Sequence, residues 1–239
     1  MTDRLDPARL SDLWDFADPG GSADRFRSGA AVGPVEAAEL ATQLARALGL
    51  AGRRPEAEAV LDGIPDVAPV VRVRSALERG RLRNSAGERQ DALPWVGRAL
   101  AEAIAAGEDD LAVDAAHMLA IADAARAAEW TQRGVVLAER SADPRVRRWL
   151  IALHNNLGWT LHEEGSFTEA LTEFELASSA ADEYGTVEQR EIAQWAIARC
   201  LRSLGQVDEA RSIQLALLEL RPDDPFVREE LDALTGSAE

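Results

Sequence analysis

The segment Asn156-Leu-Gly-Trp-Thr-Leu-His-Glu-Glu-Gly165, with Ala170, Phe174 and Ala177 behind it, decides the fold of this 239-residue chain. Apolar residues recur every three or four positions on both sides of the final glycine, which is the period of an α-helix packed along one face. Glycine can end the first helix in the left-handed conformation without steric cost. The segment therefore predicts two helices joined by a tight turn at Gly165.

The same pattern occurs four times along the chain. Each copy has a glycine, four further residues and an alanine, with an acidic residue immediately before the alanine. The acid suits the positively polarised first turn of the second helix, and the small alanine lets the two helices approach closely. The glycine and alanine pairs are Gly52 and Ala57, Gly87 and Ala92, Gly165 and Ala170, and Gly205 and Ala210.

The spacing of these alanines predicts the domain organisation. Successive alanines are 35, 78 and 40 residues apart, so the middle interval holds two repeats, one of which lacks the glycine and the alanine. We expect an N-terminal capping segment at 1–29 and a helical solenoid at 30–239. The repeats are predicted at 35–69, 70–107, 108–143 (the degenerate copy), 144–185 and 186–223, with a C-terminal capping helix at 224–236.

The four segments resemble the tetratricopeptide repeat, a helix-turn-helix unit of about 34 residues. The resemblance implies an all-α, right-handed superhelical solenoid of about five repeats with a capping helix at each end. The chain is also similar to a group of bacterial tetratricopeptide proteins, which implies a fold and no substrate. The runs that carry this second resemblance are Leu13-Trp-Asp-Phe-x-Asp-Pro-x-x-Ser22, Ala112-Val-Asp-Ala-Ala-His-Met-Leu-Ala120 and Asn155-Asn-Leu-Gly-Trp159.

Both ends of the chain carry signals for capping helices. Asp6-Pro7 opens an N-terminal helix that leads to Trp14 and Phe16 and is predicted to be broken at Asp18-Pro-Gly-Gly21. We expect these aromatic side chains to cover the first repeat; the alternative is that the segment lies in the binding groove as a tethered ligand mimic. The C-terminal helix is expected to bury Phe226, Leu231 and Leu234.

Charge and composition exclude several classes of partner. The net charge of −16 disfavours nucleic acid and anionic membranes as partners.

The single cysteine, Cys200, cannot form an internal disulfide, and we expect a buried, inert thiol. No apolar run approaches the about 20 residues of a membrane span, and no secretory signal pattern follows Met1, so the sequence predicts a cytoplasmic protein.

The sequence contains no catalytic or metal-binding pattern. The three histidines, His117, His154 and His162, have no cysteine or second histidine at metal-ligand spacing. A glycine-rich phosphate loop, a nucleophile elbow and a zinc signature are all missing from the sequence. We therefore expect no enzymatic activity, no metal and no cofactor.

The resemblance to the tetratricopeptide family implies that the first helix of each pair lines a groove. Residues of these helices that face away from the packing seam then point into it. They combine arginines with two tryptophans, which suits an acidic peptide or a C-terminal carboxylate; the alternative is that the arginines are solvated or pair with acids of the next helix. The predicted groove residues are Asn155, Trp159, His162, Trp195, Arg199, Arg202, Arg81 and Arg46.

The leading prediction is therefore a protein-protein interaction module that binds a peptide or protein segment. One alternative is a small-molecule sensor that uses the same groove. Another is a self-assembling structural protein, a homo-oligomer that stacks end to end or dimerises through the degenerate repeat near Trp130. The family's clamp for chaperone tails is built from lysine and asparagine. Trp159 stands where the clamp requires asparagine and the chain has no lysine, so that mode of binding is not expected.

Overall fold

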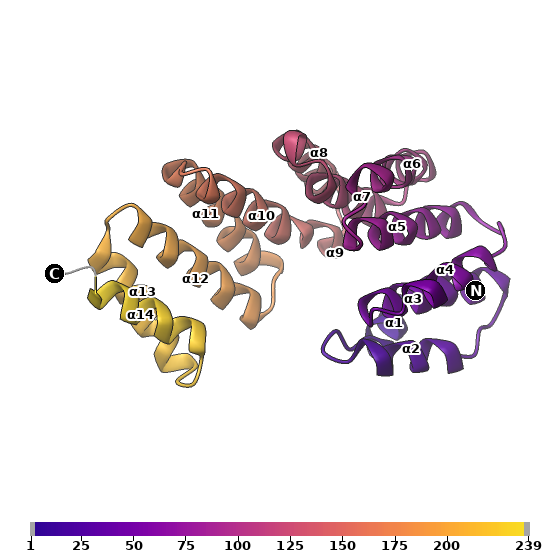
Figure 1. Cartoon of the computed structure of the whole chain (residues 1–239), viewed down its shortest axis with the longest axis horizontal. Coiled ribbons are helices and arrows are strands. Elements are labelled where there is room, and N and C mark those ends of the chain that lie inside the picture. The colour runs from indigo at the N-terminus through magenta and orange to yellow at the C-terminus, as the bar shows by residue number, and fades with distance from the viewer. Residues whose placement is uncertain (1–2, 237–239) are drawn as a thin grey trace. The chain divides into compact units, whose positions relative to one another are not determined.

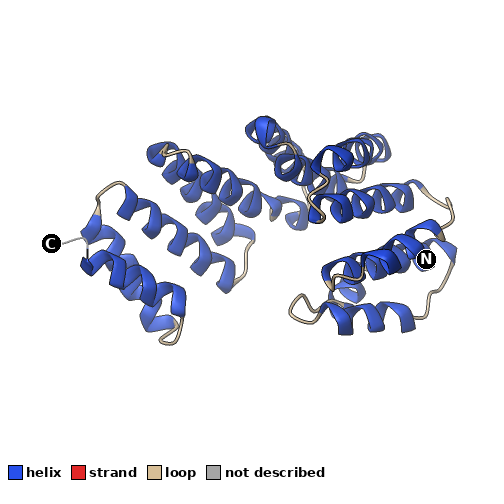
Figure 2. Cartoon of the chain, in the orientation of Figure 1, coloured by secondary structure: helices blue, strands red, loops and turns tan. Residues whose placement is uncertain are grey.

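The computed structural model describes residues 3–236 as helices joined by short loops (Figure 2). No strand occurs within this range, which confirms the all-α prediction. The chain divides into two compact units, Met1–Trp130 and Thr131–Glu239, and each is described by itself below.

Unit 1 holds the N-terminal helices and the first helix pairs (Figure 1). Within it, α2 packs on α3, and the first helices of successive pairs, α3, α5 and α7, contact one another in order. Its helices are α1 (Pro7–Leu13), α2 (Pro19–Ser28), α3 (Pro34–Leu50), α4 (Arg54–Asp62), α5 (Pro69–Ser85), α6 (Arg89–Ala106), α7 (Asp109–Ala122), the 3-10 turn η1 (Ala124–Arg126) and the start of α8 (Ala127–Arg140).

Unit 2 contains the segment quoted above. Here α10 packs on α11, α11 on α12, α12 on α13 and α13 on α14, and the first helices α10, α12 and α14 again contact one another in order. Its helices are the remainder of α8, α9 (Pro144–Arg147), α10 (Trp149–Glu163), α11 (Phe167–Tyr184), α12 (Val187–Ser203), α13 (Val207–Leu220) and α14 (Pro225–Gly236).

The tight turns of the four recognised repeats have one common geometry, as predicted. Their glycines adopt the left-handed conformation, and the residue after each glycine donates its N–H to the carbonyl five positions earlier at 2.8–2.9 Å. This is the bond that satisfies the carbonyls at a helix end in the Schellman motif. The four following alanines are completely buried. The φ values are 74° at Gly52, 79° at Gly87, 81° at Gly165 and 77° at Gly205.

A further glycine, Gly158, is required by close packing between α10 and α11. A Cβ atom at this position would lie 2.6 Å from the ring of Phe174, which is itself completely buried. The helix axes can approach this closely only because residue 158 has no side chain. Gly80 of α5 has the same relation to Val96 of α6, at 2.4 Å.

The helix ends correct two of our expectations. The N-terminal helix α1 already ends at Leu13, before Asp18-Pro-Gly-Gly21. That segment instead begins α2, because the Asp18 carboxylate accepts the Gly21 N–H and caps its first turn. Phe226 is not buried but 65% exposed. The buried face of α14 carries Val227, Glu230 and Leu234, which lie three and four residues apart and so share one side of the helix.

Candidate functional site

Six of the predicted groove residues lie on α10 and α12 of unit 2, and each is partly exposed. The ring centres of Trp159 and Trp195 are 5.9 Å apart, and the centre of the His162 ring lies 5.4 Å from that of Trp159. Two first helices thus present their aromatic side chains on a shared surface. We call it the α10–α12 face and define it by Asn155, Trp159, His162, Trp195, Arg199 and Arg202.

The arginines of this face are paired within the protein. Arg199 and Arg202 both form ion pairs with Glu230 of α14, whose side chain is only 3% exposed. For Arg199 and Arg202 the structure thus shows the alternative, pairing with an acid of a following helix, because α14 supplies a carboxylate on the same side. Two guanidinium groups still share the one carboxylate of Glu230.

The predicted groove residues of unit 1 are also engaged. Arg81 of α5 forms ion pairs with Glu78 and with Asp114 of α7, and the Asp114 side chain is 7% exposed. Burial alone would raise the pKa of Asp114. The charges of Arg81 and Arg46 and the hydrogen bonds from Arg81 outweigh that effect and hold its pKa below the usual range.

A common rule connects these contacts. In each case an arginine of one first helix forms an ion pair with a carboxylate on the first helix of a neighbouring repeat. The pairs are Glu39 of α3 with Arg74 of α5, Arg81 of α5 with Asp114 of α7, and Arg199 and Arg202 of α12 with Glu230 of α14. These side chains therefore join neighbouring repeats, and we call them the inter-repeat ion pairs.

In unit 1 the chain's own N-terminal segment, residues 3–16, lies along α3. The Leu5 N–H donates to the buried Glu39 carboxylate at 2.8 Å, and Leu5 is itself buried. Farther along, the Trp14 indole N–H donates to Gln43 at 3.0 Å. The Arg46 guanidinium lies 5.7 Å from the centre of the Trp14 ring. The segment contacts both the core of the first repeat and a predicted groove residue.

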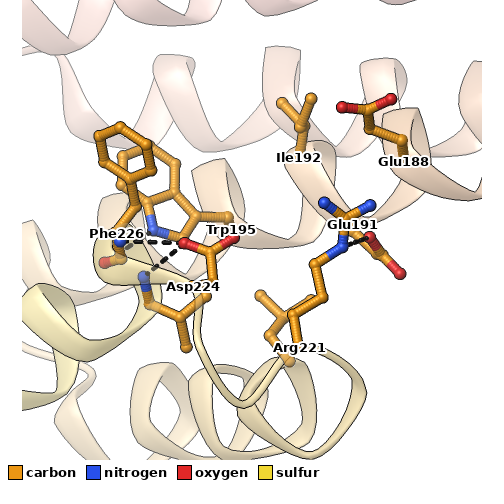
Figure 3. Close-up of a pocket in the computed structure, with 9 residues that line it drawn as sticks. Glu188, Glu191, Ile192, Trp195, Arg221, Asp224 and Phe226 are labelled. Carbon is orange, nitrogen blue, oxygen red and sulfur yellow. Dashed lines mark hydrogen bonds and ion pairs between the residues drawn. The ribbon is translucent and has the colours of Figure 1, made fainter.

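Beside the α10–α12 face, unit 2 has a cavity of about 260 Å³ (Figure 3). Its walls come from Ile192 and Trp195 of α12, Leu217 of α13, and Phe226 and Val227 of α14. In Figure 3, Trp195 and Phe226 lie together on one side, away from Arg221. The Trp195 N–H donates to the Phe226 carbonyl at 3.3 Å, and this bond helps to fix the indole. We call this feature the α12–α14 cavity.

The rim of the cavity is acidic. Glu188 and Glu191 of α12 and Asp224 before α14 border it, together with the single cation Arg221, which pairs with Glu191. Asp224 accepts the backbone N–H groups of Phe226 and Val227 and so caps α14. Three carboxylates and one guanidinium leave the rim with a net negative charge.

Trp195 was predicted from the sequence as a site residue, but the other residues that line the cavity were not. The apolar wall of the cavity requires that Phe226 is exposed. Phe226 is exposed because α14 is rotated about its axis so that Val227, and not Phe226, faces the core. A signal was present, because Ile192 and Trp195 lie three residues apart on α12 and so share a face with Glu188.

The cysteine and histidine side chains of unit 2 are buried or contact polar groups of neighbouring residues. Cys200 is completely buried, and burial raises the pKa of its thiol to about 11. Burial and the charges of Arg199 and Arg202 lower the pKa of His162, whose Nε2 lies 2.9 Å from the Ser203 hydroxyl. His154 lies 2.7 Å from the Glu173 carboxylate. Within residues 3–236, no group of three metal-ligating side chains could hold a metal ion.

Comparison with known proteins identifies the repeat. Residues 193–224 match the model of the tetratricopeptide repeat family. The fold is a tetratricopeptide-type solenoid. The matched segment covers most of α12 and all of α13. It includes Trp195, Leu217 and Arg221 of the cavity, whereas Ile192 and Phe226 lie outside it. No curated protein sequence matches the chain.

Two solved structures share this tetratricopeptide-type fold at low sequence identity. BtubC (BKLC) from P. vanneervenii has a TM-score of 0.66 and 16% identity, over 89% of this chain and 91% of that one. The nearly identical TPR-like repeats of a putative kinesin light chain from Podosopora anserina have a TM-score of 0.56 and 21% identity, over 87% and 99%. In the described part of this chain, no helix is long and apolar enough to cross a membrane.

Proposed function

We propose that this chain is a non-catalytic protein-interaction module that binds a peptide or protein segment on the α10–α12 face. Stacked helical repeats generally present extended surfaces to protein partners. The observation that carries the proposal is a row of aromatic rings. Trp159 lies 5.9 Å from Trp195, and Trp195 lies 6.4 Å from Phe226.

This row has the properties of a contact surface. Both indoles are partly exposed, and Phe226 is 65% exposed. Tryptophan and tyrosine supply large contact areas at low cost in conformational entropy and dominate the energy of protein interfaces. The indoles are held by their neighbours, because Trp159 packs on Phe174 and Trp195 bonds to the Phe226 carbonyl. A rigid surface loses little entropy when a partner binds.

The charge at one end of the row supports an acidic group in the guest. Arg199 and Arg202 exceed their shared partner Glu230 by one positive charge. A carboxylate of the guest, from a side chain or a C-terminus, can accept hydrogen bonds from these guanidinium groups. Asn155, one turn before Trp159 on α10, can bond the backbone of the guest.

The cavity has about 260 Å³, which is enough for one large side chain of a guest. A peptide can fill it with one residue and rest the remainder on the aromatic row. We further infer that the protein does not bind nucleic acid, because its net charge of −16 repels phosphate backbones.

Selection from a random dodecapeptide display library tests this proposal. We expect the wild-type chain to enrich specific peptides. Asn155→Arg, on the α10–α12 face, should weaken their binding at least about tenfold, because the larger side chain obstructs the face and the Asn155 hydrogen bonds to the guest are lost. Thr172→Arg is the matched control, because Thr172 is exposed on α11, outside the face, and should leave binding unchanged.

Two results would contradict the proposal. Peptides that bind the Asn155→Arg variant as tightly as the wild type would place the binding surface elsewhere. Failure to enrich any peptide, with the chain shown to be folded by circular dichroism, would remove the peptide-binding function.

A further inference from the structure

We infer that the α12–α14 cavity is an anchor site for one large apolar residue of the partner, and that this residue has a lysine or arginine close to it in the partner's sequence. The inference rests on the proposed peptide-binding function and adds the chemistry of the guest. It differs from the acidic guest expected from the arginines, because it concerns the opposite end of α12.

The apolar part of the inference follows from the walls. Ile192, Trp195 and Phe226 form the sides, and the buried Leu217 and Val227 form the floor. Ile192 and Phe226 are 52% and 65% exposed, which is high for large apolar side chains that border one cavity. A second molecule that covers them would remove this apolar surface from water.

The volume fits one large residue. An apolar cavity of about 150 Å³ is sufficient for a benzene ring, and this one has about 260 Å³. It can therefore accept the side chain of phenylalanine, leucine, methionine or tryptophan. The T-shaped arrangement of Trp195 and Phe226, with ring centres 6.4 Å apart, offers both a ring face and a ring edge to that side chain.

The basic part of the inference follows from the rim. Glu188 is exposed in the first turn of α12, and it borders the same cavity as Glu191 and Asp224. Arg221 compensates Glu191 but leaves two carboxylates in excess. A guest cation next to the apolar anchor would be attracted to this rim, and a guest carboxylate would be repelled.

The two ends of α12 together give the guest a direction. Glu188 and Arg199 are eleven residues apart, which is about 16 Å along a helix. The rim at Glu188 is negative, whereas near the other end two guanidinium groups, those of Arg199 and Arg202, share the single carboxylate of Glu230. The partner segment should therefore place its basic residue near the start of α12 and an acidic group near its end.

The test uses the library-selected dodecapeptides as synthetic fluorescent probes, titrated by anisotropy against the full chain. We expect the selected sequences to share a large apolar residue with a lysine or arginine within a few positions. Replacing the apolar residue of the peptide by alanine should weaken binding about tenfold or more. Replacing its basic residue by glutamate should weaken binding several-fold, and the loss should shrink at high salt.

Two pairs of protein variants test whether the apolar residue and the basic residue of the peptide bind at the cavity. Ile192→Glu places a charge on the cavity wall and should weaken binding at least about tenfold. Leu215→Glu, on α13 outside the cavity and 48% exposed, should not. Glu188→Lys should reduce affinity for the basic peptide and remove the preference over the glutamate-substituted peptide. Glu209→Lys, in the first turn of α13 and exposed, is its control.

The outcomes separate this inference from the proposed function. If peptides bind the wild type and lose affinity with Asn155→Arg but not with Ile192→Glu, the α10–α12 face binds and the anchor site is wrong. If Glu188→Lys leaves the preference for a basic residue unchanged, the rim does not select charge and that part is wrong. If no peptide is selected, the proposed function fails and the anchor site with it.

Discussion

Unit 1 and unit 2 use the same kind of helix face in different ways. In unit 1, residues 3–16 lie along α3 and contact Glu39, Gln43 and Arg46. In unit 2, α14 contacts α12 at Trp195, Arg199 and Arg202, while the first turns of α12 border an open cavity. The comparison shows that the first-helix face of a repeat can serve as an internal packing surface or remain available to a partner.

The inter-repeat ion pairs of the two units should differ in their contribution to stability. Asp114→Ala leaves Arg81, 15% exposed, without its main partner in a buried setting, and should lower the free energy of unfolding by about 3–5 kcal/mol. Glu230→Ala should cost less, about 1–3 kcal/mol, because Arg199 and Arg202 are 36% and 26% exposed and can turn to water. Urea unfolding followed by circular dichroism measures both, and an equal loss would contradict the difference in burial.

The aromatic residues of the two units should separate stability from binding. Trp14 packs on the core of the first repeat and bonds to Gln43, so Trp14→Ala should destabilise the chain by about 2–3 kcal/mol. Phe226→Ala removes a mostly exposed ring and should cost less than about 1 kcal/mol. Thermal unfolding would show this contrast. Peptide titration should show the opposite order, with Phe226→Ala weakening binding and Trp14→Ala leaving it unchanged.

The glycines at the helix seams should behave alike in both units. Gly158→Ala would place a methyl group 2.6 Å from the Phe174 ring and should cost about 1–2 kcal/mol. Gly80→Ala, against Val96, should have a cost of similar size. Gly97 lies inside α6 with no atom within 4 Å of the added Cβ, so Gly97→Ala should stabilise the chain by about 0.5–1 kcal/mol. A stabilising Gly158→Ala variant would show that α10 and α11 do not pack this closely.

The smallest expected effect is a pH dependence that arises in unit 1. Burial lowers the pKa of His117. The positive charges of Arg81 and Arg46 also lower this pKa, whereas the negative charge of Asp114 raises it by less than the other effects lower it. The neutral imidazole therefore stabilises the fold fully above the unfolded pKa of about 6.5, and this stability is lost as the pH falls through the lower folded pKa. His117→Gln should reduce the pH dependence of the free energy of unfolding below about pH 6.5. A steeper slope would show that His117 binds protons more readily in the folded state.

Much of the fold could be predicted because its determinants are local. A left-handed turn at Gly165 and the small Ala170 after it are required by neighbouring backbone atoms, and the same requirement repeats at each copy. The helical period also placed Trp159 and Trp195 on a shared face, which the structure confirms.

The charge pairing and the cavity could not be predicted in the same way. The partner of Arg81 is 33 residues away at Asp114, and that of Arg202 is 28 residues away at Glu230. Which acid meets which arginine depends on how successive first helices are offset along their axes. The rotational phase of α14 buries Val227 and exposes Phe226, and this phase creates the cavity.

Hydrogen-deuterium exchange of the full chain, with and without a library-selected peptide, tests whether the peptide binds unit 2. We predict slower exchange in α10 (149–163), in α12 (187–203) and in the first turns of α14, from residue 225, when the peptide is present, with exchange in residues 3–16 and α3 (34–50) unchanged. Protection of α3, or faster exchange in residues 3–16, would show that the peptide displaces the N-terminal segment and binds unit 1 instead. That result would contradict the assignment of the binding surface to unit 2.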